Sequence, residues 1–435
     1  MNVLKITLEL LLESEELSKY ANLAIQSHKT DGLSTDEKRL LTRLLYTVVE
    51  NKITYDYYIS KISARSSDDL SPRAKNILRL GICQILNINS VPDYAAVNEC
   101  VKLAGSKGEK SFVNGVLREF IRQRDNIPLP SREKSLKRYL SVKYSFPQPL
   151  VKHFISICCE DGAEELLSTF NTLKYTDICV NLLKISREEF LSALLRDGYD
   201  AEPSSRTPIG IRIHASVNPC NVFGYNEGYF FVQDEASAIL ATLLSIGENM
   251  RICDVCSAPG GKSLAVASLI KDKCEILSLD LHKSKLSLIE DSASRLGISS
   301  IRVDEQDATE PKAELYESFD RVICDVPCSG LGVLGKKADI RYKDLSSISE
   351  LAKIQYKILS ASKNYLKRGG VMSYSTCTLN PMENEEIVLR FIKENPDFSL
   401  LGFELGDLMG DRGMITLYPH IHKTDGFFIA LLKRN

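Results

Sequence analysis

The chain has 435 residues, 44% hydrophobic and 26% charged, with a net charge of −2. This length predicts two or three domains with sizeable cores, and the composition is that of soluble globular protein. The twelve cysteines are scattered, which favours reduced thiols in a cytosol over a disulfide framework. Acidic residues such as Glu9 and Glu13 interrupt the apolar N-terminal patch, so we expect neither a signal peptide nor a transmembrane span, and a cytoplasmic location.

The small net charge hides an asymmetry along the chain. Residues 1–140 carry 22 Lys and Arg against 17 Asp and Glu, a net +5, and the remainder carries 33 against 40, a net −7. Residues 102–143 hold 11 basic and 4 acidic side chains. Such a stripe is typical of a surface that binds a phosphate backbone, although a solvated helix face is nearly as compatible with the charge alone.

Helical periodicity dominates the first 125 residues. Apolar residues recur at helical spacing in residues 36–49, 71–86 and 94–104. Ser71 followed by Pro72 is a typical helix start, and Pro92 separates two helices. An all-helical domain over residues 1–128 follows, with no side chain in it that suggests catalysis.

Three segments of this domain carry a resemblance to a known family. Residues 78–86 (LRLGICQIL), 91–99 (VPDYAAVNE) and 112–118 (FVNGVLR) resemble the NusB-type RNA-binding domain. In the bacterial ribosomal RNA cytosine methyltransferases of the RsmB (Sun/Fmu) type, that domain is fused to a catalytic part. The resemblance implies ribosomal RNA as partner, and we expect a monomer.

A smaller module follows a linker at residues 125–130, which reads Asp-Asn-Ile-Pro-Leu-Pro. Strand-like residues 178–183 precede a helix at 188–196 and a second strand at 210–213. This pattern predicts an α+β connector over residues 129–225, similar to the family's connector. The family's proline pair after an asparagine is absent here, and Cys179 stands where the family has arginine.

Strands and helices alternate through the last predicted domain, residues 226–435. We expect strands at 251–256, 275–280, 301–303, 321–326, 371–375 and 427–432, separated by helices at 262–271, 283–296, 349–366 and 383–393. Alternation of this kind predicts a doubly wound, mostly parallel sheet. The resemblance to methyltransferases implies a Rossmann-like fold with an antiparallel last strand.

A glycine-containing loop follows the first of these strands. Walker A spacing would require glycine where Cys256 stands, and the loop is not Gly-x-Gly-x-x-Gly, so triphosphate and dinucleotide sites are disfavoured. The lone pair Cys253 and Cys256 has no second ligand pair, so we expect no metal. Asp280 ends the next strand, the usual position of an acid that binds ribose hydroxyls. The loop and acids resemble the S-adenosylmethionine site of RNA cytosine-5 methyltransferases, which implies as cofactor contacts Cys256, Ser257, Ala258, Pro259, Gly260, Gly261, Lys262, Asp280, Asp307 and Asp325.

Two cysteines follow strand-like runs, Cys328 after Asp325-Val-Pro and Cys377 after Ser-Tyr-Ser-Thr. Ligands of open α/β sheets bind at the carboxyl ends of the strands, so both thiols and Asp325 should face one crevice. After Cys377, Asn380 can cap a helix, and Glu383 three residues later completes a capping box. A nearby helix N-terminus would favour a thiolate at Cys377.

The resemblance assigns chemistry to this pair. Carbon-5 of cytosine becomes nucleophilic when a thiolate adds to carbon-6. Family resemblance makes Cys377 the nucleophile, Cys328 the residue that assists release, and Asp325 the group that stabilises charge on the ring. Related DNA enzymes use the Pro-Cys thiol as the nucleophile, which leaves an exchange of the two roles open.

The expected function is transfer of a methyl group from S-adenosylmethionine to carbon-5 of one cytosine in small-subunit (16S) ribosomal RNA. Alternatives are the same chemistry on transfer RNA, and a non-catalytic RNA-binding assembly or antitermination factor. In the segment that follows Cys328, lysines stand where the family usually has paired arginines, so phosphate contacts there would be weaker. The expected RNA contacts are Arg118, Arg122, Lys336, Lys337 and Arg341.

Overall fold

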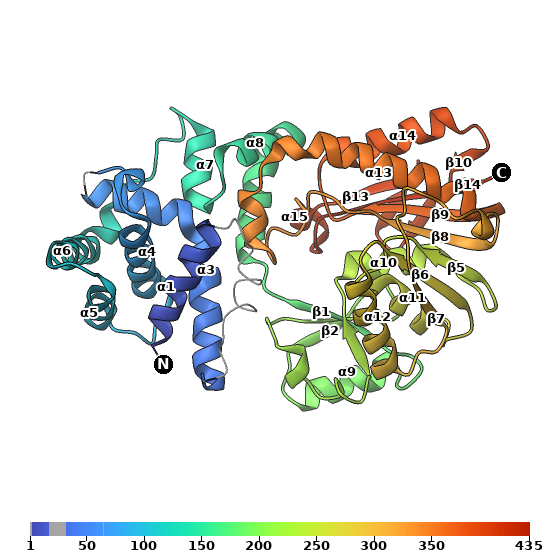
Figure 1. The fold of residues 1–435 in the computed structure, drawn as a ribbon, viewed down its shortest axis with the longest axis horizontal. Helices are drawn as coiled ribbons and strands as arrows, with labels where there is room; N and C mark the ends of the chain where they lie inside the picture. Colours follow the sequence, from blue (N-terminus) through green and yellow to red (C-terminus); the bar gives the residue numbers. More distant parts are fainter. Residues whose placement is uncertain (1, 17–31, 64) are drawn as a thin grey trace. The chain divides into compact units, whose positions relative to one another are not determined.

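The chain forms two compact units in a computed structural model, which describes residues 2–16, 32–63 and 65–435 (Figure 1). The helical unit comprises Met1–Asn171 and Lys336–Lys343. The sheet unit comprises Thr172–Gly335 and Asp344–Asn435. The finer division into domains at residues 128 and 225 stays a prediction.

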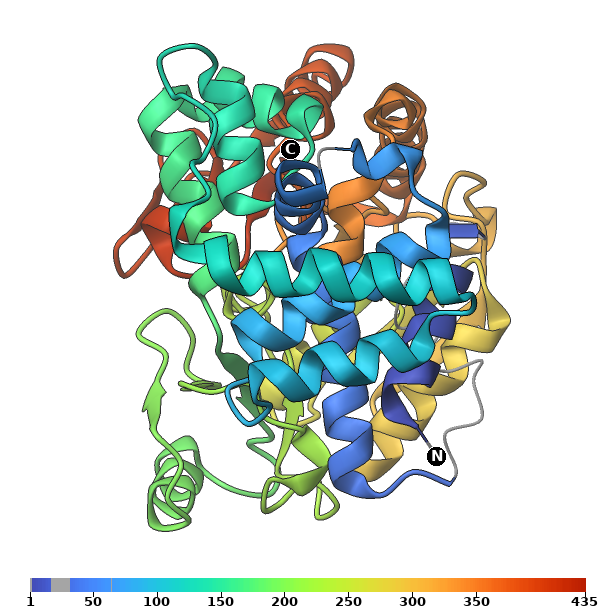
Figure 2. The same cartoon turned by 90° about the vertical axis from the view of Figure 1, so that its left-hand side faces the viewer.

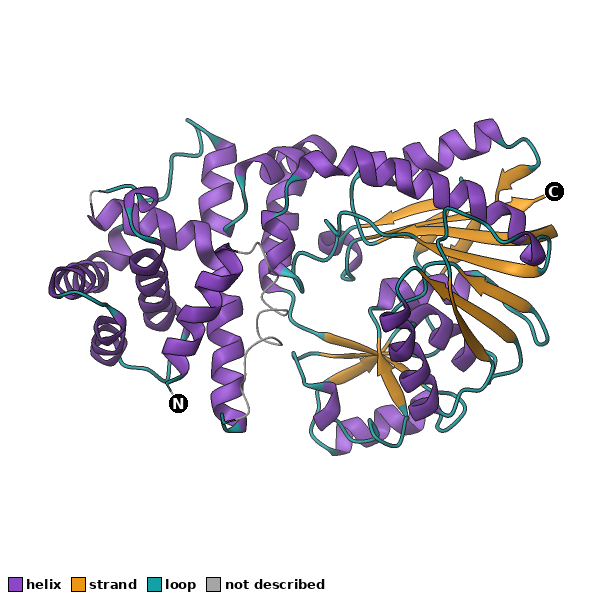
Figure 3. Cartoon of the chain, viewed as in Figure 1, coloured by secondary structure: helices purple, strands orange, loops and turns teal. Residues whose placement is uncertain are grey.

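The helical unit is built from helices and loops, and none of its described residues forms a strand (Figure 3). The helices predicted from periodicity are confirmed, and Ser71 caps the second of them by accepting a hydrogen bond from the Ala74 N–H at 3.2 Å. Helices α5 and α6 lie side by side (Figure 2). The bounds are α1 (Val3–Glu16), α3 (Thr35–Ser63), α4 (Pro72–Asn87), α5 (Asp93–Leu103), α6 (Lys107–Gln123), α7 (Leu136–Tyr144) and α8 (Gln148–Thr172).

Residues far apart in the sequence build the core of this unit. Leu44, Leu80 and Leu117 come from three helices and are buried together with Ala338 of the short turn Ala338–Tyr342. Tyr342 donates a hydrogen bond to the Val49 carbonyl at 2.8 Å. The chain therefore leaves the sheet unit after Gly335, contributes to the helical core, and re-enters the sheet unit at Asp344.

The sheet unit begins with a small antiparallel sheet in the order β2-β3-β1-β4. The strand predicted at residues 178–183 ends early, at Val180, because the Asn181 side chain turns to the carbonyls of Gly228 (2.9 Å) and Leu296 (2.7 Å). The bounds are β1 (Thr176–Val180), α9 (Arg187–Arg196), β2 (Ala201–Pro203), β3 (Gly210–Ile213) and β4 (Phe230–Val232).

The larger sheet has the order β10-β14-β9-β8-β5-β6-β7, and β13 pairs with β14. Strands β7, β6, β5, β8 and β9 are parallel, and β14 is antiparallel to β9, as the family resemblance implied. Its elements are α10 (Glu235–Leu243), β5 (Arg251–Asp254), α11 (Gly261–Leu269), β6 (Glu275–Asp280), α12 (Lys283–Leu296), β7 (Ile301–Glu305), β8 (Phe319–Asp325), α13 (Ile348–Ser362), β9 (Leu366–Thr376), α14 (Glu385–Glu394), β10 (Phe398–Leu400), β13 (Met414–Leu417), α15 (Pro419–His422) and β14 (Phe427–Arg434).

Both faces of this sheet are covered, as in a doubly wound fold (Figure 1). Ile252 of β5 is buried with residues of α10, α11 and α12, and the next residue, Cys253, is buried on the other face with residues of α13 and α14. The alternation follows from the two-residue period of a strand. Among the described residues, no helix combines the length and the hydropathy needed to cross a membrane.

Candidate active site

The two cysteines singled out in the sequence lie next to each other. Strand β8 ends at Asp325 and the neighbouring β9 at Thr376, in a parallel register that pairs Asp325 with Ser375. Both chains therefore turn off the same edge of the sheet. The Cys328 Sγ and the Cys377 Sγ are 3.2 Å apart, and both cysteines are reduced.

The Cys328 thiol is held in its protonated form. A hydrogen bond with Cys377, together with burial, raises the pKa of Cys328 well above its usual value. Cys328 therefore holds its proton more firmly than a free thiol does.

Asp325 is held from two sides. Its Oδ2 lies 2.5 Å from the Lys262 Nζ, and its Oδ1 accepts a hydrogen bond from the Ser375 hydroxyl at 2.8 Å. Burial lowers the pKa of Lys262, and the attraction of Asp325 more than offsets this, so the pKa is raised. The Lys262 Nζ also lies 5.3 Å from the centre of the Phe427 ring. The edge that carries the thiols thus holds a permanent cation.

Glu383 holds the loop that carries Cys328. Its fully buried carboxylate accepts hydrogen bonds from the Ser329 N–H (2.8 Å), the Ser329 hydroxyl (2.6 Å) and the Gln355 amide (3.0 Å). The predicted capping box is wrong: the Asn380 side chain caps only the short turn Pro381–Glu383, and α14 begins at Glu385. The Glu383 side chain bonds across to a distant loop instead. Cys377 therefore lies eight residues before α14, so the capping argument no longer supports an effect of that helix dipole on its thiol.

The glycine loop joins β5 to α11 across the same edge. Gly260 has φ +103°, and a Cβ there would lie 3.2 Å from Ile289, so glycine is required. No side chain caps α11, which leaves its first N–H groups for a ligand. Asp280 accepts hydrogen bonds from the Ala258 N–H (3.2 Å) and the His282 N–H (3.0 Å), and Asp307 accepts two from Thr309. A glycine cradle, open amides and a strand-end acid fit a nucleoside with a charged amino-acid tail.

Sequence reasoning missed several groups at this edge. Ser375 and Phe427 contact Asp325 and Lys262, and the Gly426 N–H donates to the Gly332 carbonyl at 2.8 Å. These contacts join segments about 50 to 160 residues apart, so no local spacing signals them. Ser375 is the register partner of Asp325 and lies one residue before the end of β9. This position near a strand end is the only feature of the sequence that could have indicated its role.

The residues expected to contact RNA lie in the helical unit. Arg118 and Arg122 are exposed on α6, where Arg118 bonds Asn114 at 3.0 Å and Arg122 pairs with Glu119. Lys336 and Lys337 are exposed. Arg341 needs a correction: it is buried, its guanidinium lies 4.0 Å from the Phe146 ring centre, and it donates to the Glu50 carbonyl at 3.3 Å. Burial against an aromatic ring makes Arg341 an anchor of the inserted turn and keeps it from phosphates.

The fold and the site together define a class of protein. A mostly parallel sheet with an antiparallel last strand, a glycine loop after its first core strand and a strand-end acid form the S-adenosylmethionine-binding methyltransferase fold, here joined to a NusB-like helical unit. The family model described as 16S rRNA methyltransferase RsmB/F matches residues 241–433, and the NusB family model matches residues 1–122.

Relatives narrow the class to one family. The chain is 34% identical to a probable ribosomal RNA small subunit methyltransferase B of Bacillus subtilis, over 100% of this chain and 99% of that protein. A protein of the same description from Synechocystis is 35% identical over 94% of each chain. The crystal structure of PH0851 is similar to this chain with a TM-score of 0.80 and 26% identity, covering 100% of this chain and 99% of that one. The chain belongs to the ribosomal RNA small subunit methyltransferase B family.

Proposed function

We propose that this protein methylates carbon-5 of one cytosine in 16S ribosomal RNA through a covalent adduct with Cys377. The observation that carries the proposal is the 3.2 Å separation of the Cys328 and Cys377 sulfurs beside the Lys262–Asp325 pair. In this proposal one pyrimidine ring contacts both sulfurs and the ion pair at once. A base in structured RNA must be splayed out of its stack to do so.

The proposed reaction begins at Cys377. Its thiolate bonds to carbon-6 of the ring, and the electron pair of the 5,6 double bond moves toward carbon-5 and the N3–O2 side. Asp325 faces that side and shares a proton with N3, which takes up the electron pair there, and the Lys262 ammonium balances the charge of the carboxylate. When bound at the glycine loop, S-adenosylmethionine supplies an electrophilic methyl group for carbon-5.

Release reverses the addition. The carbon-5 proton leaves to water, the 5,6 double bond re-forms, and the carbon-6 to sulfur bond breaks with its electron pair on Cys377. Cys328 supports this step as an acid, because its raised pKa keeps it protonated next to the departing sulfur. The assignment makes Cys377 the nucleophile and Cys328 the release residue.

Single substitutions of Cys328 and Cys377 by alanine test which thiol is the nucleophile and which assists release. Cys328→Ala should accumulate a denaturant-resistant adduct with 16S rRNA in the presence of S-adenosylmethionine, and Cys377→Ala should form none. The opposite pattern would exchange the roles. Tritium transfer from the labelled cofactor, measured on 16S rRNA, assembling subunits and transfer RNA in parallel, tests the substrate.

Labelling of transfer RNA alone would mean that transfer RNA, and not 16S rRNA, is the substrate. No transfer to any RNA would favour an RNA-binding factor without catalysis. Bisulfite sequencing of cellular 16S rRNA with and without the gene would then identify the modified cytosine.

A further inference from the structure

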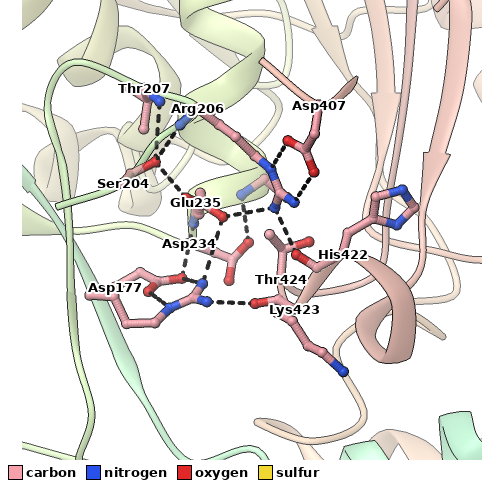
Figure 4. A network of polar contacts seen from close by, with 12 residues as sticks. Asp177, Ser204, Arg206, Thr207, Asp234, Glu235, Asp407, His422, Lys423 and Thr424 are labelled. Atoms are coloured by element: carbon pink, nitrogen blue, oxygen red, sulfur yellow. Dashed lines mark hydrogen bonds and ion pairs between the residues drawn. The ribbon is translucent and has the colours of Figure 1, made fainter. Parts of the chain in front are cut away.

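An ionic network in the sheet unit holds a main-chain segment near the C-terminus (Figure 4). The far end of this segment contacts the loop that carries Cys328. The segment, residues 422–426, begins at the last residue of α15 and leads into β14. We propose that Arg206 and Arg212 are positioning residues that hold this segment, and through it the Cys328 loop, in the geometry needed for release. The inference rests on the proposed function and gives the small sheet a role in catalysis.

Arg206 makes the first set of contacts with this segment. Its guanidinium forms a two-point ion pair with Asp407 (2.8 and 2.7 Å) and donates to the His422 carbonyl at 2.7 Å. It also contacts Glu235 at 3.2 Å. Only 12% of the side chain is exposed, so these charge-assisted bonds act where water competes little.

Arg212 makes the second set of contacts one residue further along the segment. Its guanidinium pairs with both oxygens of Asp177 (2.7 and 2.9 Å) and donates to the Lys423 carbonyl at 2.7 Å. It lies 3.9 Å from the centre of the Tyr175 ring. Two arginines from the small sheet and its loop thus hold two consecutive carbonyls of the C-terminal segment, and both belong to a network whose other members are shown in Figure 4.

The segment ends against the Cys328 loop. The Gly426 N–H donates to the Gly332 carbonyl at 2.8 Å, and the Gly332 N–H donates to the Cys377 carbonyl at 2.9 Å. A Cβ on Gly426 would lie 2.6 Å from the Gly332 Cα, so the two main chains touch. A shift of residues 422–426 therefore moves Gly332, four residues after Cys328, and disturbs its bond to Cys377.

The effect on the two thiols should differ. Cys377 directly follows β9, which is paired on both sides, with β8 and β14. Cys328 lies in a loop without a strand partner, between Asp325 and Gly332. Loosening of the network should therefore displace Cys328 more than Cys377, and slow adduct release more than adduct formation.

Arg206→Met tests this with little danger to folding, because Asp407 is 60% exposed and Glu235 keeps its contact with Arg212. The variant should accumulate the covalent 16S rRNA adduct above the wild-type level. Its kcat should fall by ~10- to 100-fold, the range for a misplacement of up to ~1 Å. The KM for S-adenosylmethionine should stay within about twofold of wild type, because the glycine loop is untouched. Gly426→Ala, at the other end of the path, should act in the same direction.

Arg434→Met is the matched control. Arg434 is 14% exposed, donates to the Leu366 carbonyl at 2.5 Å and pairs with Glu317 at 2.7 Å, but lies at the opposite end of β14 from Phe427. It should leave the adduct fraction at the wild-type level even if stability falls.

A wild-type adduct level in Arg206→Met, or an equal rise in Arg434→Met, overturns the inference. If Gly426→Ala does not fold, Asp407→Asn takes its place and should raise the adduct by a smaller factor. Absence of an adduct from both Cys328→Ala and Cys377→Ala on the same gel would instead overturn the proposed function, and the positioning role with it.

Discussion

The Glu383 carboxylate should stabilise the sheet unit strongly, and its removal is the sharpest test of how the Cys328 loop is held. Its oxygens accept five hydrogen bonds, from two atoms of Ser329 and from Gln355, Thr378 and Asn380. Glu383→Ala leaves the Ser329 N–H and the Asn380 amide buried without this acceptor. At ~1–3 kcal/mol for each unsatisfied buried group, plus a small cavity, the loss should be about 3–5 kcal/mol.

Glu383→Gln should cost less, about 1–2 kcal/mol, because one amide oxygen still accepts from Ser329 and Gln355 and the hydroxyls can rotate to accept from the new amide. Only the Asn380 side-chain amide, which donates to the carboxylate in wild type, then faces the N–H donors of the new glutamine amide. The chain has no tryptophan, so urea unfolding is best followed by far-ultraviolet circular dichroism. Glu386→Ala, an exposed carboxylate in the first turn of α14, is the control and should change stability by less than ~0.5 kcal/mol.

Equal midpoints for Glu383→Gln and Glu383→Ala would refute the reasoning, because an amide retains most of the acceptor geometry that alanine lacks. A loss below ~1 kcal/mol for Glu383→Ala would refute it as well, since at least two buried donors lose this partner. The second result would mean that the Cys328 loop is held by something other than this carboxylate, and the first, at a large loss, that the charge of the carboxylate and not its acceptor geometry holds the loop.

Three further changes have definite expected outcomes. Burial raises the pKa of Asp254 to about 7, so the stability that its protonated form contributes is present at low pH and is lost as the pH rises toward 7. In urea unfolding between about pH 5 and 8, the midpoint of Asp254→Asn should therefore rise relative to that of wild type as the pH increases. Arg341→Ala should destabilise the helical unit by about 2–4 kcal/mol in the same denaturation assay, because it empties a buried site against Phe146, and a loss no larger than that of exposed Lys337→Ala would contradict this. Arg122→Ala should leave stability unchanged, weaken RNA binding and reduce the salt dependence of log K by about one; an unchanged slope would remove Arg122 from the RNA contacts.

Much of the fold could be predicted because its signals are local. Ser71 before Pro72 predicted the correct start of α4, and the strand-helix alternation after residue 250 predicted a doubly wound, mostly parallel sheet. The convergence of Cys328 and Cys377 also followed, since neighbouring parallel strands end at one edge. Each of these predictions needs only a few adjacent residues and a general rule of packing.

The two wrong predictions, the capping box and the RNA contact of Arg341, arose where side chains distant in sequence bind a residue more favourably than its neighbours do. The spacing of Asn380 and Glu383 is that of a capping box, yet Glu383 lies 54 residues from Ser329 in sequence and bonds it in the core. Arg341 sits in a charged stretch that resembles a phosphate contact, and is buried by Phe146 from almost two hundred residues earlier. In both cases a buried site with complementary partners is worth more than the local alternative.

The same reasoning explains why the small sheet had a predicted place but no predicted role. A lone arginine in a connector is most often a solvated surface residue, and nothing near Arg206 or Arg212 in the sequence suggests otherwise. Their partners Asp407 and Lys423 lie about two hundred residues away. The His422 and Lys423 carbonyls and the carboxylates of Asp407 and Asp177 come within reach of these arginines only in the folded chain. An enzyme can thus build the support of its reacting loop from residues whose identity no motif constrains, and substitutions there should alter release of the product before they alter binding of the cofactor.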